Sequence, residues 1–154
     1  MDEEPAAASQ LITASALIAR LGEPKLRIVD ARFELTEPRA GAEMYARGHV
    51  PGAVHLDLDR DLAAPAKRGE GRHPLPDMTA FARSLGELGI GRRTPVVVYD
   101  QTGTMYAARA WWLLRYAGHE DVRFVDGGFA AYLAAGGPVS TEIPAIPPTS
   151  FELN

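Results

Sequence analysis

The sequence contains no cysteine among its 154 residues. Without a thiol the chain can form no disulfide, cannot use a thiolate as a nucleophile and cannot build a cysteine-based zinc site. These three kinds of chemistry are therefore excluded before any motif is considered.

Long apolar runs and blocks of basic residues are also missing. No apolar run approaches the ~18 residues that a membrane span needs, and 16 basic residues against 20 acidic ones give a net charge of −4. Neither a membrane nor a nucleic acid is therefore expected as a partner. Residues 1–10 have neither the basic nor the apolar region of a secretory signal, and a cytoplasmic location is expected.

The residues that are present favour one globular domain in which strands and helices alternate. Apolar residues make up 46% of the chain and charged residues 23%, which is typical of a soluble domain. Apolar and β-branched runs predict strands over 26–30, 53–58, 95–99 and 122–125. Helical periodicity, good helix formers and end signals predict helices within 11–21, 42–46, 77–88, 105–116 and 129–135. Thr13 or Ser15 is expected to cap the first of them. This alternation predicts a parallel sheet with crossover helices on both of its faces.

Both ends of the chain differ from this pattern. Residues 1–10 predict a flexible tail, and residues 11–137 contain all the periodic segments. Residues 138–154 are rich in proline and lack periodicity, which predicts an extended interdomain linker. Because Phe151 and Leu153 resume an apolar pattern, we interpret the end as the start of a missing second domain. Self-association or partial disorder is then expected near residues 151–154.

One loop stands where a ligand site is expected. Asp100, Gln101, Thr102, Gly103 and Thr104 follow the strongest predicted strand and directly precede a predicted helix. In open α/β sheets ligands bind at the carboxyl ends of strands, and amides at a helix N-terminus attract anions. Asp100 could be a nucleophile at a strand end, but Asp100 or Thr104 could also simply cap the helix. From this loop alone the capping role is favoured.

The loop is locally similar to that of enzymes that form an aspartyl phosphate, which reads D-x-D-G-T or D-K-T-G-T after an apolar strand. In those enzymes the carboxylate attacks phosphorus while Mg²⁺ and a lysine neutralise charge. The only lysines here, Lys25 and Lys67, both precede the loop, and no suitable acidic pair follows it. A phosphatase with an aspartate nucleophile is therefore the less favoured interpretation.

A second resemblance covers nearly the whole chain. The segment GHVPGA at 48–53 resembles the G-H-[IV]-P-G-A signature of the rhodanese family, and DARF at 30–33 resembles its D-A-R/S-W motif. VVVYD at 96–100, ARAWW at 108–112 and VDGGF at 125–129 match in family order and spacing. The chain resembles the first, non-catalytic domain of two-domain thiosulfate or 3-mercaptopyruvate sulfurtransferases. The resemblance implies a three-layer α/β domain with a parallel sheet of about five strands and helices on both faces.

The resemblance also implies a function. In the family's catalytic second domain a cysteine begins the loop and becomes a persulfide, whereas Asp100 stands at that position here. A carboxylate cannot become a persulfide, so the chain alone is expected to be inactive and to use no cofactor. The expected partners are a C-terminal catalytic rhodanese domain of the same polypeptide and a small anionic sulfur donor. The chain would supply structural support and one wall of the interdomain active site.

The resemblance gives individual residues expected roles. The pocket wall is expected to include Phe33, Met105, Tyr106 and Arg109, although for Arg109 a structural salt bridge is favoured. His49 is a weak candidate for proton transfer, because in its turn it can simply bind backbone. The four histidines lack the spacing of metal ligands, so no metal site is expected. A stand-alone regulatory or binding module is the alternative to a part of a sulfurtransferase.

Overall fold

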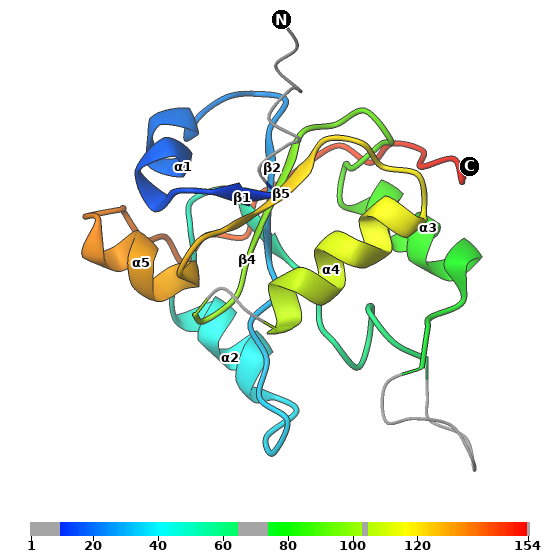
Figure 1. Cartoon of the computed structure of the whole chain (residues 1–154), viewed down its shortest axis with the longest axis horizontal. Coiled ribbons are helices and arrows are strands. Elements are labelled where there is room, and N and C mark those ends of the chain that lie inside the picture. Colours follow the sequence, from blue (N-terminus) through cyan, green and yellow to red (C-terminus); the bar gives the residue numbers. More distant parts are fainter. Residues whose placement is uncertain (1–9, 65–73, 103–104, 154) are drawn as a thin grey trace, which may run out of the picture.

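The computed structural model of the chain describes residues 10–64, 74–102 and 105–153. Within these residues five parallel strands form one sheet in the order β1-β5-β4-β2-β3 (Figure 1). The strands are β1 (Leu11–Ile12), β2 (Arg27–Asp30), β3 (Ala53–His55), β4 (Val96–Tyr99) and β5 (Val122–Val125). The helices are α1 (Ala14–Arg20), α2 (Ala40–Arg47), α3 (Met78–Glu87), α4 (Met105–Tyr116) and α5 (Gly128–Ala134).

Helices cover both faces of the sheet and create three layers. Side chains of α1, α2 and α5 form one buried cluster with the sheet, and side chains of α3 and α4 form the other (Figure 1). The residues of β4 alternate between them, since Val97 and Tyr99 enter the first cluster and Val96 and Val98 the second. A central strand of a parallel sheet is buried on both sides, which explains its uninterrupted apolar run. The three-layer α/β fold with a parallel sheet is confirmed.

The largest departure from the predicted elements lies at the first helix. We predicted a helix start within residues 11–21 with Thr13 or Ser15 as the cap, and Thr13 does cap α1 by accepting a hydrogen bond from the Ala16 N–H (3.1 Å). Leu11 and Ile12 instead form β1, an edge strand that pairs with β5. The strand β1 was not predicted, because a two-residue strand has no periodicity of its own. At the other edge β3 ends at His55 and is shorter than predicted.

The proline-rich segment after α5 is extended, and it is bound to the domain along its length. We call residues 138–153 the C-terminal strap. Near its start the backbones of Ser140 and His49 exchange two hydrogen bonds (2.9 and 2.8 Å). Further along, the Thr149 N–H donates to the backbone of α3 (2.8 Å), and Phe151 is buried among side chains of α3 and α4. The strap is therefore part of the core packing.

This packing corrects one expectation about the end of the chain. Partial disorder near residues 151–154 is wrong for Phe151, which is 7% exposed, while Asn154 lies outside the described residues. Gly86 in α3 shows how closely the strap approaches, since a Cβ at that position would lie 2.4 Å from the backbone oxygen of Thr149. Any side chain at this position would push the strap away from α3.

His119 holds the far end of the strap as a neutral ring. Its Nε2 donates to the Thr94 carbonyl (2.6 Å), its Nδ1 accepts from the Asp121 N–H (3.2 Å), and the ring stacks on Phe151. Only an uncharged imidazole can both donate and accept in this way. Burial lowers the pKa of His119 below its usual value of 6.5.

We expect His119 to make the folded protein less stable in mild acid. Below about pH 6.5 the unfolded ring binds a proton that the folded ring resists, so the free energy of unfolding should decrease as the pH falls. His119→Gln keeps a donor and an acceptor at these positions but does not titrate. Urea unfolding at about pH 8 and about pH 5.5 should show a larger loss for the original protein than for the variant. Equal losses would contradict this assignment.

Candidate functional site

The loop after β4 closes around the carboxylate of Asp100. Its Oδ1 accepts the Thr102 N–H (3.1 Å), and its Oδ2 accepts the N–H groups of Tyr106 (3.1 Å) and Ala107 (2.9 Å) at the start of α4. The side chain is 1% exposed. Amides and the dipole at a helix N-terminus stabilise negative charge. These three amides therefore form an anion cradle, and the Asp100 carboxylate fills it.

This geometry decides between the two roles considered for Asp100. The capping role is confirmed, because the carboxylate accepts hydrogen bonds from the first turn of α4. A phosphatase role is disfavoured, because both oxygens face loop amides and almost none of the side chain is exposed to a phosphate ester. Gly103 and Thr104, which complete the predicted inactive loop, lie outside the described residues.

Gln101 and α5 fix the loop from two sides. The Gln101 side chain accepts the Phe33 N–H (3.3 Å) and donates to the Phe33 carbonyl, so it binds the segment after β2 as a backbone would. On the other side the N–H groups of Phe129 and Ala130 donate to the carbonyls of Asp100 (2.7 Å) and Gln101 (3.1 Å). The anion cradle is therefore rigidly positioned at the carboxyl edge of the sheet.

The expected pocket-wall residues lie around this loop at different depths. Met105 is 61% exposed at the start of α4. The half-buried Tyr106 packs edge to face on Phe33, with 5.6 Å between ring centres, and Phe33 itself is buried. Arg109 donates to two backbone carbonyls between β3 and α3 (3.0 and 3.2 Å), and burial lowers its pKa. The structure brings Phe33 and Tyr106 into contact, whereas Arg109 binds the segment between β3 and α3. The part of all four residues in a pocket wall stays a prediction.

A buried ion pair, for which no role was predicted, lies next to the loop. The Nε and Nη2 of Arg32 donate to the Asp30 carboxylate (2.9 and 2.7 Å), and Nη2 also donates to the Gly48 carbonyl (2.6 Å). The guanidinium carbon lies 4.3 Å from the centre of the Phe129 ring. The D-A-R and G-H motifs marked both partners, but only the fold shows that the two motifs touch.

Tyr99 extends this pair into a network. Its hydroxyl donates to Asp30 (2.8 Å) and accepts the Val50 N–H (3.1 Å). Burial and the charge of Asp30 raise the pKa of Tyr99, so the hydroxyl stays a donor. The network joins the carboxyl ends of β2 and β4 to the turn before β3. The signature residues 48–53 therefore position the strand ends from which the site loop projects.

His49 is enclosed by the same turn. Its Nδ1 lies 2.7 Å from the Tyr45 carbonyl oxygen, and its Nε2 lies 2.6 Å from the Glu142 carbonyl oxygen in the strap. The ring stacks on Tyr45 at 3.8 Å and is fully buried. These contacts favour the backbone-binding role of His49 over proton transfer, since no substrate could reach the ring.

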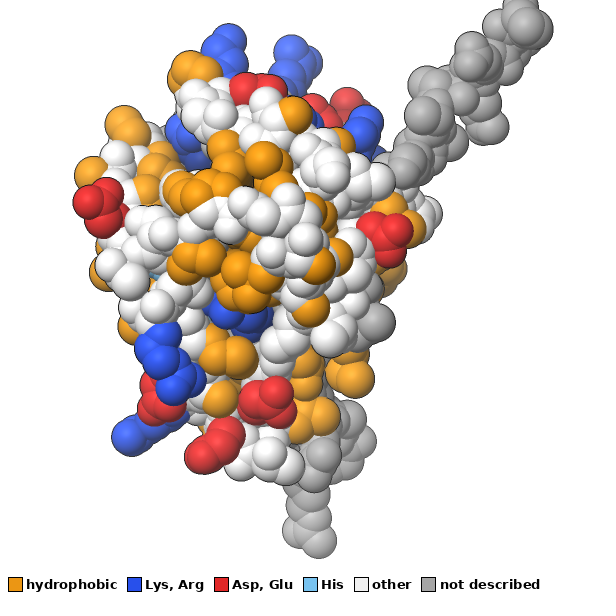
Figure 2. Space-filling model, turned by 90° about the vertical axis from the view of Figure 1, so that its left-hand side faces the viewer, with side chains coloured by type: hydrophobic (Ala, Val, Ile, Leu, Met, Phe, Trp, Pro, Cys, Tyr) orange, Lys and Arg blue, Asp and Glu red, His pale blue; other side chains and the backbone are white. Residues whose placement is uncertain are grey.

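An apolar groove lies beside the ion pair, between α2, α5 and the strap. Its volume is about 300 Å³. Figure 2 shows this side of the molecule, where hydrophobic side chains gather around the middle of the face. Leu133 and Val139 at the groove are each about half exposed. The groove is lined by Arg32, Met44, Arg47, Gly48, Phe129, Leu133 and Val139.

The part of the chain that the structure describes contains no group of three or more His, Asp or Glu side chains that could hold a metal ion. In the same ranges, no helix combines the length and apolar character that crossing a bilayer requires. At the carboxyl edge of the sheet, the anion cradle is a set of amides arranged to bind a negatively charged group.

Comparison with known sequences gives a consistent result. A family model described as a Rhodanese-like domain matches residues 13–135. A probable 3-mercaptopyruvate sulfurtransferase from Pseudomonas aeruginosa is 45% identical over 146 residues, which cover 94% of this chain and 51% of that protein. The putative thiosulfate sulfurtransferase SseB of Mycobacterium tuberculosis is 42% identical over 133 residues, covering 85% of this chain and 46% of the relative.

Solved structures agree with the sequence relatives. SseA of Escherichia coli, a 3-mercaptopyruvate sulfotransferase, superposes with a TM-score of 0.82 and 31% identity over 95% of this chain and 55% of that one. The 3-mercaptopyruvate sulfurtransferase of Leishmania major gives a TM-score of 0.83 with 30% identity over 98% and 41%. The chain spans about half the length of the curated relatives that it matches. Together with the parallel sheet, the turn at residues 48–53 and the Asp100 loop before α4, these matches show that the chain belongs to the rhodanese family.

Proposed function

We propose that the chain is a non-catalytic rhodanese domain that forms one wall of a sulfurtransferase active site. A C-terminal catalytic rhodanese domain of the same polypeptide would supply the reactive cysteine and complete the site. The observation that carries this proposal is the Asp100 carboxylate in the anion cradle, with no cysteine anywhere in the chain. The names of the relatives and their roughly twofold length support it.

The chemistry of the anion cradle explains why this domain would be non-catalytic and its partner domain catalytic. Loop amides at a helix N-terminus favour a thiolate, and therefore a persulfide, at the position that Asp100 holds. The same amides bind the Asp100 carboxylate, but a carboxylate cannot accept or carry sulfane sulfur. The reaction would move that sulfur from an anionic donor, thiosulfate or 3-mercaptopyruvate, to cyanide or a thiol. This chain would leave the transfer itself to its partner.

The surface around the Asp100 loop carries apolar side chains, as one wall of an interdomain active site would need to. Met105 is exposed directly beside the cradle, and the ring of Tyr106 packs against the buried ring of Phe33. An apolar cover of this kind would keep water away from a persulfide held by the opposing domain. The half-exposed Leu133 and Val139 add apolar surface near the same edge, which a second domain could cover.

The first test uses the chain alone. It is expected to release only background thiocyanate from thiosulfate and cyanide, and background pyruvate from 3-mercaptopyruvate and a thiol. Mass spectrometry after incubation with either donor should show no added sulfur. Genuine turnover, or a sulfur-loaded form of the chain, would contradict the proposal.

The second test restores a partner. We expect activity from a chimera in which this chain, through residue 153, replaces the first half of the Pseudomonas aeruginosa relative. Met105→Ala in the chimera should raise KM or lower kcat about fivefold, the effect of losing roughly 1 kcal/mol of apolar contact. Trp112→Ala is the matched control, because Trp112 is also exposed on α4 but lies about 10 Å further along the helix.

The control also separates the alternatives. Equal effects of the two substitutions would show that Met105 has no special place in the site. An inactive chimera, under conditions in which the relative's own first half supports activity, would instead favour a stand-alone binding module.

A further inference from the structure

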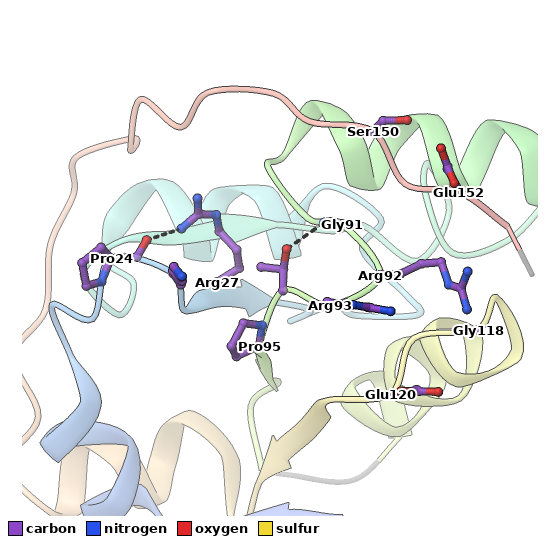
Figure 3. Close-up of a pocket in the computed structure, with 12 residues that line it drawn as sticks. Pro24, Arg27, Gly91, Arg92, Arg93, Pro95, Gly118, Glu120, Ser150 and Glu152 are labelled. Atoms are coloured by element: carbon purple, nitrogen blue, oxygen red, sulfur yellow. Dashed lines mark hydrogen bonds between the residues drawn. The ribbon is translucent and has the colours of Figure 1, made fainter.

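A second candidate site lies at the amino edge of the sheet, opposite the Asp100 loop. A cavity of about 620 Å³ opens there between the segment before β2, the turn before β4, the end of α4 and the strap (Figure 3). Small-molecule sites commonly have volumes of roughly 300–1,000 Å³. Its charged lining residues are Lys25, Arg27, Arg92, Arg93, Glu120 and Glu152.

Most of the positive charge in this cavity is not neutralised. Arg27 is engaged by backbone carbonyls, including those of Pro24 (2.9 Å) and Gly89 (3.2 Å). Lys25, Arg92 and Arg93 form no hydrogen bond or ion pair with any residue in the described ranges. Three cationic groups therefore line one cavity without an ion-pair partner among the described residues.

Arg92 provides a second observation that points to a ligand in this cavity. Its Nε is buried and has no hydrogen-bond partner among the described residues. A buried donor of a charged group is rarely left unpaired, because its desolvation is then uncompensated. Figure 3 shows the Arg92 side chain reaching across the cavity toward Gly118 and Glu152, with Arg93 between Arg92 and Arg27.

Features of the domain itself do not account for these cations. Glu120 and Glu152 also line the cavity, but two carboxylates stand against four cations, and neither lies within 4.0 Å of a cationic nitrogen in the described ranges. The C-terminus of α4 points to the same edge and favours positive charge near it. That helix end still gives the Nε of Arg92 no acceptor.

We propose that this cavity binds a small oxyanion carrying at least two negative charges, held by Arg92, Arg93 and Lys25. Planar guanidinium groups donate paired hydrogen bonds to phosphate or carboxylate oxygens, and an ammonium group adds a point charge. The cavity is large enough for a compound with more than one such group. The site is separate from the anion cradle, so it stands or falls independently of the proposed function.

Pyrophosphate is the first probe, titrated into the 154-residue chain at constant ionic strength and followed by calorimetry and by NMR shifts of backbone amides. We expect saturable binding with shifts centred on residues 91–95 and 118–120. The double variant Arg92→Gln/Arg93→Gln should weaken binding about tenfold or more. The control Arg39→Gln/Arg123→Gln removes the same charge at two exposed arginines outside the cavity and should leave the affinity within about twofold.

A stability measurement separates binding from a structural role. Without ligand, Arg92→Gln/Arg93→Gln should unfold at the same or a higher temperature than the original protein, because it removes repulsion and an unpaired donor. With pyrophosphate only the original protein and the control variant should gain stability. A lower melting temperature of the cavity variant without ligand would indicate a structural role and overturn the proposal.

Three further outcomes would also overturn it. Equal weakening in the two double variants would indicate unspecific attraction between charges. An absence of saturable binding by pyrophosphate, tripolyphosphate and citrate would show that the cavity does not take small oxyanions. Binding of a glutamate-rich peptide in preference to all three would identify an acidic protein segment as the occupant instead.

Discussion

Replacing Arg32 with methionine is expected to lower the free energy of unfolding by about 3–5 kcal/mol. Methionine keeps most of the aliphatic volume, but it leaves the fully buried Asp30 carboxylate without its counter-charge and the Gly48 carbonyl without its donor. The loss is a large part of the roughly 5–15 kcal/mol that stabilises an ordinary domain. Urea unfolding followed by far-UV circular dichroism measures it.

Two further variants identify the buried charge as the cause. Asp30→Asn/Arg32→Met removes both charges and should be more stable than Arg32→Met alone, which gives a favourable coupling in the double-mutant cycle. Arg20→Met breaks the exposed pair with Glu23 (3.2 Å) and should cost less than about 1 kcal/mol. If the single and double variants at the buried pair were equally stable, the uncompensated charge could not be the source of the loss.

Asp100→Ala is expected to destabilise the domain by about 2–4 kcal/mol. The substitution leaves the amides of Thr102, Tyr106 and Ala107 without this acceptor and removes negative charge from the N-terminus of α4. Asp100→Asn keeps the size and one carbonyl acceptor, so its loss should be intermediate. Thermal unfolding of the purified variants provides the comparison.

Asp77 supplies the matched control for this prediction. It caps α3 by accepting the N–H groups of Thr79 (2.9 Å) and Ala80 (3.4 Å), but it is exposed to solvent. Asp77→Ala should cost about 1 kcal/mol, because water replaces the lost acceptor. An Asp100→Ala loss no greater than this would mean that burial adds nothing to the cradle, and that Asp100 is an ordinary cap.

The parts of the fold that could be predicted are those whose signals lie within one element. The good helix formers of residues 105–116, followed by Gly118, and the β-branched run of residues 95–99 predicted α4 and β4 almost to the residue. The edge strand β1 could not be found this way, because its two residues become a strand only by pairing with β5. The same holds for the site. Asp100 could be singled out from the sequence of its own loop, whereas the role of Arg32 depends on its contact with Gly48, which only the fold shows.

The same distinction applies to the end of the chain. Proline content correctly indicates an extended backbone over the strap, since prolines disfavour helices there. It carries no information on whether that backbone lies in solvent or on the domain. The burial of Phe151 depends on α3, α4 and His119, which are separated from it by tens of residues along the chain. Only the folded arrangement shows this contact.

The course of residues 138–153 determines where this protein can be shortened or fused. A truncation after residue 137, where the periodic segments end, would open a hydrophobic cleft by removing Phe151 and would strip the His49 turn of its pairing with Ser140. Such a product would expose apolar surface prone to aggregation. We therefore expect a stable domain to extend at least to Phe151 and expression or domain-shuffling junctions to be tolerated only beyond it.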